Sequence, residues 1–408
     1  MRILYFHQYF NTPEMSGSTR SYEIARRLVA GGHRVDIVTS DRGSGASSNW
    51  RESECGGARV HWIAVPYSNE LPFARRMRAF LRYALAAARR SSSIDADLIF
   101  ATSTPLTIAL PAAYAKLRKR VPLIMEIRDL WPEVPIAMGV LRSRSSRALA
   151  RALERFAYAC SARVVALSPG MADGVARAGY PRERVVTLPN ACDLELFDVP
   201  VSVGQAFRAS HPWLGDRPLV VYAGTLGRAN DVGFLVRLAG SMRWIDERVR
   251  FLVVGDGAER EDLRALAAQL GVLDRTLFMM DPVPKLAMPR ILAAADLAVS
   301  TFARVPALWT NSANKVFDAL ASGTPIAINH GGWIAELLDD HDAGLILDAA
   351  DAEAAARRLA AALADGEWLA RAATNARRLA RDRFSRDRLV AQLEQLMREV
   401  VAESARAR

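Results

Sequence analysis

Residues 308–337 read LWTNSANKVFDALASGTPIAINHGGWIAEL, a polar loop followed by helix, strand and helix signals in close succession. The pattern predicts a helix over 312–322, with Ser312 as its N-cap and a Gly-Thr-Pro turn after it. A short strand, 325–329, is expected next, and the Gly331-Gly332 turn then leads into another helix. Helices that alternate with buried strands are typical of a parallel sheet in an α/β domain.

Two charged residues of this predicted helix, Lys315 and Asp318, are three positions apart and therefore share one face. A free helix N-terminus beside a lysine favours a phosphate, and a carboxylate suits sugar hydroxyls, so the pair fits a nucleotide-sugar site. An ordinary surface salt pair is the simpler alternative. Lysine is scarce in this chain, with four residues among 54 basic ones, which favours a specific use of Lys315.

The length of 408 residues is enough for two domains with separate cores. The hydrophobic content of 51% is that of a globular chain, and no apolar run is long enough to predict a transmembrane helix. The start, MRILYFHQYF, is expected to be a buried strand and not a signal peptide. Three scattered cysteines predict neither disulfides nor a metal site, so we expect a cytoplasmic enzyme.

The net charge of +10 calls for an anionic partner, and we expect phosphorylated substrates or an anionic membrane and no nucleic acid. Residues 73–90 combine apolar positions at helical spacing with six arginines, Arg75, Arg76, Arg78, Arg82, Arg89 and Arg90. Such a basic amphipathic helix can lie on anionic lipid. A helix packed on the core with a solvated arginine face is the alternative.

The beginning of the chain predicts a β-loop-α-β unit, with Ser16 and Gly17 at the helix N-terminus and no nicotinamide fingerprint. A second candidate site is the turn 126–133, which follows a buried strand. It contains Arg128, Asp129 and Glu133, although Arg128 and Asp129 can also be a structural pair.

After an irregular linker at about 198–217, a second α/β domain opens with the strand 219–223. The turn after this strand contains Gly224, Thr225, Gly227 and Arg228, whose amides and guanidinium suit a diphosphate. The chain ends in a long basic helix, expected at 385–403.

Several of these segments together resemble family 4 glycosyltransferases, in particular the bacterial WbuB-like branch that builds O-antigen, capsule and exopolysaccharide. The resemblance rests on Asn314-Lys315-x-Phe317-Asp318-x-Leu320-Ala321-x-Gly323-x-Pro325 with Gly331-Gly332-x3-Glu336, on Arg128-Asp129-Leu130-Trp131-Pro132-Glu133, and on Pro189-Asn190. The chain departs from the family at Thr310, where a glutamate is usual, and at Ser16, where a Gly-Gly pair is usual.

The resemblance implies a GT-B fold: two Rossmann-like doubly wound domains, 1–198 on the acceptor side and 199–384 on the donor side, facing across a cleft. Residues 385–408 would form a helix that crosses back to the first domain. It further implies a retaining hexosyltransferase without a cofactor, using a nucleoside-diphosphate sugar, with UDP favoured. We also expect the transfer to need no metal. The acceptor would be polyprenyl-linked or a saccharide, and the enzyme would lie on the inner face of the plasma membrane.

The resemblance also assigns roles to residues. Lys315, Asp129, Arg228 and Glu133 are expected to act in catalysis. Substrate binding is expected of Ser16, Gly17, Arg128, Gly224, Thr225, Gly227, Pro284, Asn314, Asp318, Gly331, Gly332 and Glu336, with Asp318 on the ribose. A nucleotide-sugar epimerase of the same fold and a non-catalytic nucleotide-binding scaffold remain alternatives.

Overall fold

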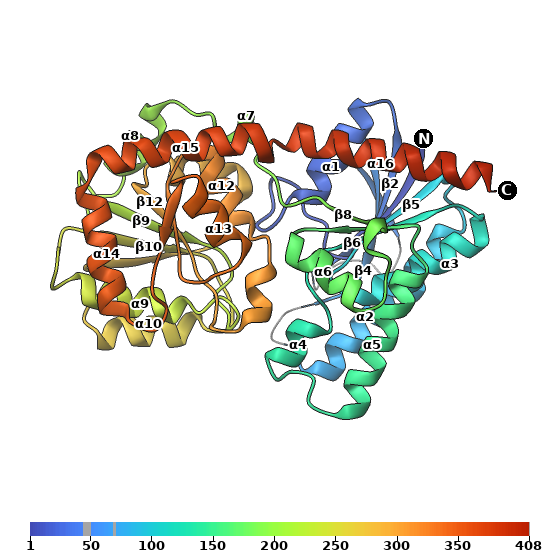
Figure 1. Ribbon diagram of the computed structural model, residues 1–408, viewed down its shortest axis with the longest axis horizontal. Coiled ribbons are helices and arrows are strands. Elements are labelled where there is room, and N and C mark those ends of the chain that lie inside the picture. Colours follow the sequence, from blue (N-terminus) through green and yellow to red (C-terminus); the bar gives the residue numbers. More distant parts are fainter. Residues whose placement is uncertain (44–49, 68–70, 408) are drawn as a thin grey trace. The chain divides into compact units, whose positions relative to one another are not determined.

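The computed structural model describes residues 1–43, 50–67 and 71–407 (Figure 1). The chain forms two compact units. The first unit comprises Met1–Thr12, Ser18–Pro189 and Asp387–Arg408, and the second comprises Pro13–Gly17 and Asn190–Arg386. Each unit has its own sheet covered by helices, so the prediction of an α/β protein with two doubly wound domains is confirmed.

The sheet of the first unit has the strand order β3-β4-β2-β1-β5-β6-β7-β8, in which β3 is antiparallel to β4 and the other pairs are parallel. Its strands are β1 (Arg2–Phe6), β2 (Arg34–Asp41), β3 (Arg51–Cys55), β4 (Ala58–Ala64), β5 (Leu98–Thr102), β6 (Leu123–Ile127), β7 (Arg163–Ala166) and β8 (Val185–Thr187). The strand order reverses between β1 and β5, and the carboxyl ends of strands at such a point are where α/β sheets bind ligands.

Helices cover both faces of this sheet. They are α1 (Arg20–Ala30), α2 (Phe73–Ser91), α3 (Ala109–Lys119), α4 (Glu133–Ala137), α5 (Arg144–Ala159), α6 (Pro169–Arg177) and α16 (Arg386–Arg406), with short 3-10 turns at Leu106–Ile108 and Arg182–Arg184. Helix α3 contacts both α2 and α5, so these three helices lie next to one another on one face. The sequence supports these helices locally, since Ser143 and Ser168 cap α5 and α6 by accepting backbone N–H groups.

The second unit has the strand order β11-β10-β9-β12-β13-β14, with all pairs parallel. Its strands are β9 (Leu219–Ala223), β10 (Arg250–Val254), β11 (Leu277–Met280), β12 (Leu297–Ser300), β13 (Ile326–Ile328) and β14 (Gly344–Ile346). Alternate residues of β9 enter two different cores, because side chains along a strand point to opposite faces. Leu219 and Val221 pack in one core, and Val220 and Tyr222 in the other.

The helices of the second unit complete these two cores. They are α7 (Leu194–Phe197), α8 (Val201–Ala209), α9 (Val232–Met242), α10 (Arg260–Gln269), α11 (Met288–Leu292), α12 (Asn314–Ser322), α13 (Trp333–Asp340), α14 (Ala352–Ala364) and α15 (Gly366–Phe384), with 3-10 turns at Lys285–Ala287 and Pro306–Thr310. The switch in strand order falls between β9 and β12, which makes their carboxyl ends the expected ligand edge of this unit.

Two local expectations were wrong. The segment predicted as an irregular linker contains α8, which buries Phe207 and places Gly204 so close to Ala293 that a Cβ there would lie 2.2 Å from the Ala293 carbonyl oxygen. Helix α12 begins at Asn314, and Ser312 does not cap it. The Ser312 hydroxyl instead accepts the backbone N–H of Asn190 at 3.0 Å, which ties the loop before α12 to the segment that opens the second unit.

The long C-terminal helix α16 belongs to the first unit from Asp387 onward and runs beside α1 in Figure 1. Its apolar residues Val390, Leu393, Met397 and Val400 recur every three or four positions and are buried. Charged residues at its ends hold it in place: Arg27 of α1 pairs with Asp387, and Arg163 of β7 pairs with Glu403 at 2.8 Å.

Candidate active site

The ammonium of Lys315 lies at the carboxyl end of β9 in the second unit. It donates hydrogen bonds to the Tyr222 hydroxyl at 3.0 Å and to the Asn230 side-chain oxygen at 3.4 Å. It also lies over the Tyr222 ring, 4.2 Å from the centroid. The Tyr222 hydroxyl in turn donates to the Thr225 carbonyl at 2.8 Å. The lysine is therefore held in a fixed position beside the loop that follows β9.

This lysine is half-buried, and burial lowers the pKa of its ammonium to about 7. Within residues 1–43, 50–67 and 71–407, no carboxylate forms an ion pair with it. A cation that is partly removed from water and lacks a counter-ion favours an anionic ligand, because a bound anion compensates the lost hydration.

The loop after β9 brings its backbone close to this cation. A Cβ on Gly224 would lie 3.0 Å from the Lys315 Cε atom, so a side chain there would displace the lysine. The neighbouring loop after β10 packs as tightly, since a Cβ on Gly255 would lie 1.9 Å from the Gly224 carbonyl oxygen. Thr225 and Arg228 are exposed along the same loop. The structure thus brings Gly224 and Thr225 close to Lys315, and Arg228 follows them on the same loop.

Sequence reasoning missed a group of polar residues at the carboxyl ends of β12 and β13. The Ser300 hydroxyl, the Asn329 side-chain nitrogen and the His330 Nε2 atom are buried and have no hydrogen-bond partner among the described residues. Burial also lowers the pKa of His330, which favours the neutral ring. Buried polar atoms are normally paired, so this group indicates a place for polar ligand atoms. The signal was the Asn-His-Gly-Gly run at the end of the predicted strand 325–329.

The Gly331-Gly332 turn sits at the start of α13, as its sequence indicates. Gly332 has a φ of +87°, and a Cβ on it would lie 2.7 Å from the Trp309 carbonyl oxygen, so the position requires glycine. The Trp333 indole donates to the Asn311 carbonyl at 2.7 Å and holds the two loops together. Glu336, in the first turn of α13, is exposed.

Asp318 lies in a different environment from the one expected. Its carboxylate pairs with the Lys285 ammonium, and both side chains are buried. Burial raises the pKa of the Asp318 carboxyl, and the charge of Lys285 opposes this rise. The alternative interpretation, a surface salt pair between Lys315 and Asp318, is therefore not found among the described residues, and Asp318 already has a protein partner. Pro284, just before Lys285, is exposed, and Asn314 is the first residue of α12.

The first unit has its own polar cluster where β1 and β6 end. Arg128 donates to the Ser18 hydroxyl at 2.9 Å and approaches the His7 Nε2 atom at 3.5 Å. His7 and Gln8 are buried, and the His7 Nδ1 atom and both polar atoms of the Gln8 side chain lack partners within the described part of the chain. Burial keeps the pKa of His7 well below its usual value. Sequence reasoning missed His7 and Gln8, although both directly follow the first strand.

Beneath this cluster lies a buried ion pair. The Arg20 guanidinium donates to Glu126 at 2.8 Å and to the Pro189 carbonyl at 2.7 Å, and the Thr102 hydroxyl donates to the other Glu126 oxygen at 2.9 Å. A buried pair with this many hydrogen bonds fixes its surroundings. It holds the strand end from which Arg128 and Asp129 project.

The remaining predicted residues of the amino-terminal half are exposed. Asp129 follows Arg128 and accepts a hydrogen bond from the Thr104 hydroxyl at 3.4 Å. Glu133 opens α4 and lies 3.6 Å from the Arg177 guanidinium. Ser16 is exposed, and Gly17 has a φ of +116°, a conformation that favours glycine.

Two Asp-x-Asp tripeptides occur in the chain, at 95–97 and 340–342. In the structure, aspartates of each tripeptide pair with an arginine. Asp95 and Asp97 pair with Arg2 at 3.2 and 2.7 Å, at the amino end of β5. Asp342 pairs with Arg371 at 2.7 Å. Asp95, Asp97 and Asp342 are therefore held in structural ion pairs, near the amino ends of β5 and β14 and not at the carboxyl ends described above.

Family models agree with this two-unit arrangement. Residues 17–191 match the glycosyl transferase 4-like domain, and residues 204–379 match the glycosyl transferases group 1 domain. The chain is a GT-B glycosyltransferase. The enzyme class and the family 4-like character predicted from the sequence are thereby confirmed, whereas the WbuB-like branch stays a prediction.

Named relatives of this glycosyltransferase support the same conclusion. It is 29% identical over 385 residues to the D-inositol 3-phosphate glycosyltransferase of Xylanimonas cellulosilytica. The aligned residues cover 90% of this chain and 88% of the relative. It is 28% identical to the lipopolysaccharide core biosynthesis glycosyltransferase LpsE of Rhizobium meliloti, over 57% of this chain and 63% of the relative. Among solved structures, Anabaena Alr3699/HepE in complex with UDP and glucose superimposes with a TM-score of 0.74 at 18% identity, covering 98% and 100% of the two chains. That likeness shows the fold.

Proposed function

We propose that this glycosyltransferase moves a sugar from a nucleoside diphosphate, with UDP favoured, to a lipid-linked or saccharide acceptor in cell-surface polysaccharide synthesis. The observation that carries the donor proposal is Lys315, a half-buried cation without a carboxylate partner among the described residues, beside the bare backbone of Gly224. The complex of HepE with UDP and the name of LpsE support the choice of base and of pathway.

The chemistry requires stabilisation of the leaving group. As the bond between the anomeric carbon and the diphosphate oxygen breaks, negative charge grows on the phosphate, and fixed positive charge lowers the barrier. Lys315 and Arg228 would supply that charge, and the amides around Gly224 and at the start of α13 would add hydrogen bonds. The buried polar atoms of Asn329 and His330, which have no hydrogen-bond partner among the described residues, would contact the donor.

In the proposed reaction the acceptor oxygen forms the new bond to the anomeric carbon on the face that the diphosphate leaves, so configuration is retained. The proton of the acceptor hydroxyl passes to the departing phosphate oxygen, and no metal is required. Arg128, Asp129 and Glu133, together with His7 and Gln8, are our candidates on the acceptor side. One carboxylate oxygen of Asp318 pairs with Lys285, and this pair would position α12. The second oxygen of Asp318 would contact the ribose.

We further propose that the enzyme works at the inner face of the plasma membrane. The structure contains no helix, within its described residues, that is long and apolar enough to cross a bilayer. Helix α2 exposes Arg75, Arg78, Arg82 and Arg89 together with Leu81 and Leu85. The neighbouring α3 and α5 expose Leu117 and Leu149 at 77% and 73%. Apolar side chains surrounded by cations suit an anionic lipid surface.

The donor proposal is tested with Lys315→Ala. We expect turnover to fall by about 10²-fold or more, because a charge that stabilises the transition state is lost. The protein is first screened by thermal shift against UDP, GDP, ADP and TDP, with and without EDTA, and then assayed with the sugar of the nucleotide that binds.

Lys119→Ala, a lysine of α3 in the other unit, is the matched control and should leave the rate unchanged. Near-normal turnover by Lys315→Ala would remove this residue from the mechanism. Conversion of the donor sugar without any acceptor would replace the transferase proposal with an epimerase.

A further inference from the structure

Tyr222 of β9 is fully buried, and its hydroxyl connects two parts of the candidate donor site. The hydroxyl donates to the Thr225 carbonyl at 2.8 Å and accepts from the Lys315 ammonium at 3.0 Å. A hydroxyl has a single proton, and a carbonyl oxygen can only accept. The hydroxyl therefore presents a lone pair to Lys315, which fixes the direction of the hydrogen bond between them.

The ammonium of Lys315 has three N–H donors, and the protein uses two of them. One is directed to the Tyr222 hydroxyl, and a longer bond of 3.4 Å runs to the Asn230 side-chain oxygen. These two oxygens are the acceptors that Lys315 has within the described part of the chain. The third N–H group is therefore left for a ligand beside the bare backbone of Gly224, and Tyr222 is the closer of the two residues that orient it.

The packing of the core does not require this hydroxyl. The Tyr222 ring packs in the same core as Val220 and Val299, where a phenylalanine ring would have the same shape. A buried hydroxyl costs free energy unless it is hydrogen-bonded, so its presence needs another reason. Because it holds both the Thr225 carbonyl and the Lys315 ammonium, it couples this cation to the loop whose amides would bind the diphosphate.

Other titratable groups act on this pair. Burial, and to a smaller extent the charge of Lys315, lowers the pKa of His330 at the end of β13, which favours its neutral ring. Burial, and after it the charge of Glu259, raises the pKa of Tyr222, so the hydroxyl keeps its proton. Burial also raises the pKa of Glu259, and the charge of Arg228 opposes this rise. The close partner that stabilises the Lys315 ammonium is thus a neutral hydroxyl.

We propose that Tyr222 is a positioning residue for the transfer, and that its hydroxyl holds the Lys315 ammonium in the charged form, directed at the leaving diphosphate. This role rests on the proposed function, in which Lys315 stabilises the departing phosphate. A hydrogen-bond acceptor favours an ammonium over the neutral amine. The ring face adds a cation–π contact at 4.2 Å from the centroid, which a phenylalanine would keep.

The first test follows the proton of Lys315 directly in the full chain. The chain has only four lysines, so lysine labelled with ¹³C at Cε gives few NMR signals, and Lys315→Arg identifies the one of Lys315. Tyr222→Phe removes the hydroxyl and keeps the ring. The midpoint of the Lys315 titration should move down by roughly one pH unit, because the ammonium loses a hydrogen-bond acceptor. Asn230→Ala should give a smaller movement, since its bond is longer.

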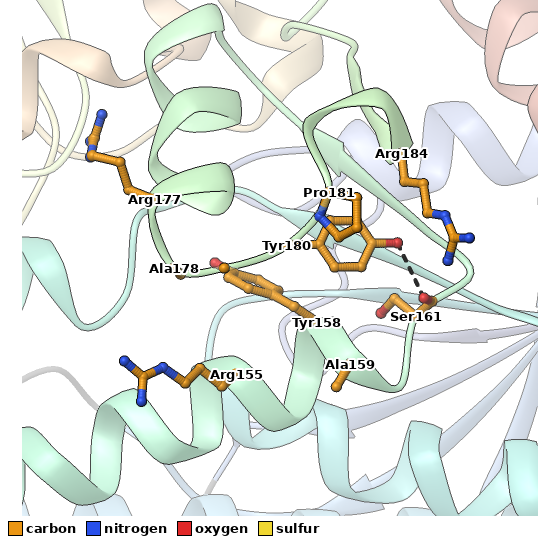
Figure 2. A pocket seen from close by; sticks show the side chains of 10 residues that line it. Arg155, Tyr158, Ala159, Ser161, Arg177, Ala178, Tyr180, Pro181 and Arg184 are labelled. Atoms are coloured by element: carbon orange, nitrogen blue, oxygen red, sulfur yellow. Dashed lines mark hydrogen bonds between the residues drawn. The ribbon is translucent and has the colours of Figure 1, made fainter.

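The matched control is Tyr180→Phe, a buried tyrosine of the first unit. Its hydroxyl donates to the Ser161 backbone carbonyl at 3.1 Å, as Figure 2 shows. None of the described residues that line the cavity beside it is a lysine. The change therefore removes a buried hydroxyl bonded to a carbonyl, as Tyr222→Phe does, and should leave the Lys315 titration unchanged. An unchanged titration in Tyr222→Phe as well would overturn the proposal.

A second arm measures kcat/KM against pH with the nucleotide sugar that the enzyme turns over. In Tyr222→Phe the alkaline limb should move to lower pH by the same roughly one pH unit, because Lys315 loses its proton earlier. In a Lys315→Arg background the same change should not move the limb, since arginine stays charged. An equal effect in both backgrounds would mean that the hydroxyl acts through the loop alone, and the role through Lys315 would be wrong. If the wild type turns over no nucleotide sugar, the proposed function fails, and the NMR titration still decides whether Tyr222 sets the charge of Lys315.

Discussion

At the scale of single residues, the two buried or half-buried lysines of the second unit are in opposite situations. Lys285 has a carboxylate partner in Asp318, whereas Lys315 has a tyrosine ring, a hydroxyl and an amide oxygen. A ring face and neutral oxygens stabilise an ammonium less than a carboxylate does. Lys315 is thus the cation whose charge state depends on what binds next to it.

This difference leads to a prediction about protons. Because the pKa of Lys315 is about 7 in the free protein, most of the ammonium is deprotonated at pH 8. A bound diphosphate raises the pKa, so binding at pH 8 should take up roughly 0.9 of a proton. Calorimetry in two buffers of different ionisation enthalpy measures this uptake.

Lys315→Arg is the informative control for that experiment, because arginine stays charged and should bind without proton uptake. Affinity should also fall as the pH rises above 7 in the wild type and stay level in Lys315→Arg. Equal uptake by both proteins would mean that another group takes the proton.

The pair of Lys285 and Asp318 supports a prediction about stability. Asp318→Ala would leave the buried Lys285 ammonium without its partner, which should cost about 3–5 kcal/mol of folding free energy. Replacing both residues with methionine removes both charges and should recover most of that loss. Chemical denaturation of the wild type, of Asp318→Ala and of the double methionine variant measures both effects. A stable Asp318→Ala variant with weakened nucleotide binding would favour the ribose role instead.

At the scale of elements, helix α2 shows what an amphipathic pattern can and cannot determine. The arginine-rich face was expected, but Arg76 turns to the Tyr67 ring and Arg90 pairs with Glu52 and lies over Trp50. Leu81 and Leu85, which fit the apolar spacing, are 46% and 63% exposed. The pattern alone does not show where the contact with the core ends.

The exposed leucines make the membrane proposal testable without touching the core. Leu81→Ser with Leu85→Ser should lower binding to vesicles that contain phosphatidylglycerol by roughly tenfold, because two apolar side chains no longer enter the lipid. Arg75→Ala, Arg78→Ala, Arg82→Ala and Arg89→Ala should reduce it further at low salt. Flotation measures both effects.

The control for this experiment removes four exposed arginines of the second unit, Arg264, Arg290, Arg358 and Arg381. It should float like the wild type. If both α2 variants also float normally, α2 is not the membrane contact.

At the scale of the whole molecule, the doubly wound architecture could be predicted because alternating buried strands and glycine-bounded turns are local signals. The partners of individual side chains could not. Asp318 pairs with Lys285 across 33 residues, and Arg20 with Glu126 across 106, and such pairings follow from topology. The atoms of Gln8 and His330 that lack a partner among the described residues likewise become visible only once the surrounding helices are in place.

The chain passes between the two units four times, at 12–13, 17–18, 189–190 and 386–387, so the stability of the first unit depends on residues at the far end of the sequence. Met397 is fully buried in α16. Met397→Asp places an uncompensated charge there and should destabilise the first unit by roughly 3–5 kcal/mol. Ala402→Asp, on the exposed side of the same helix, should change the stability of the first unit little.

Calorimetry measures both effects. With Met397→Asp, the melting transition of the first unit should move down alone, whereas the nucleotide that binds should raise only the transition of the second unit. A single transition that shifts as a whole with either change would show instead that the two units unfold as one.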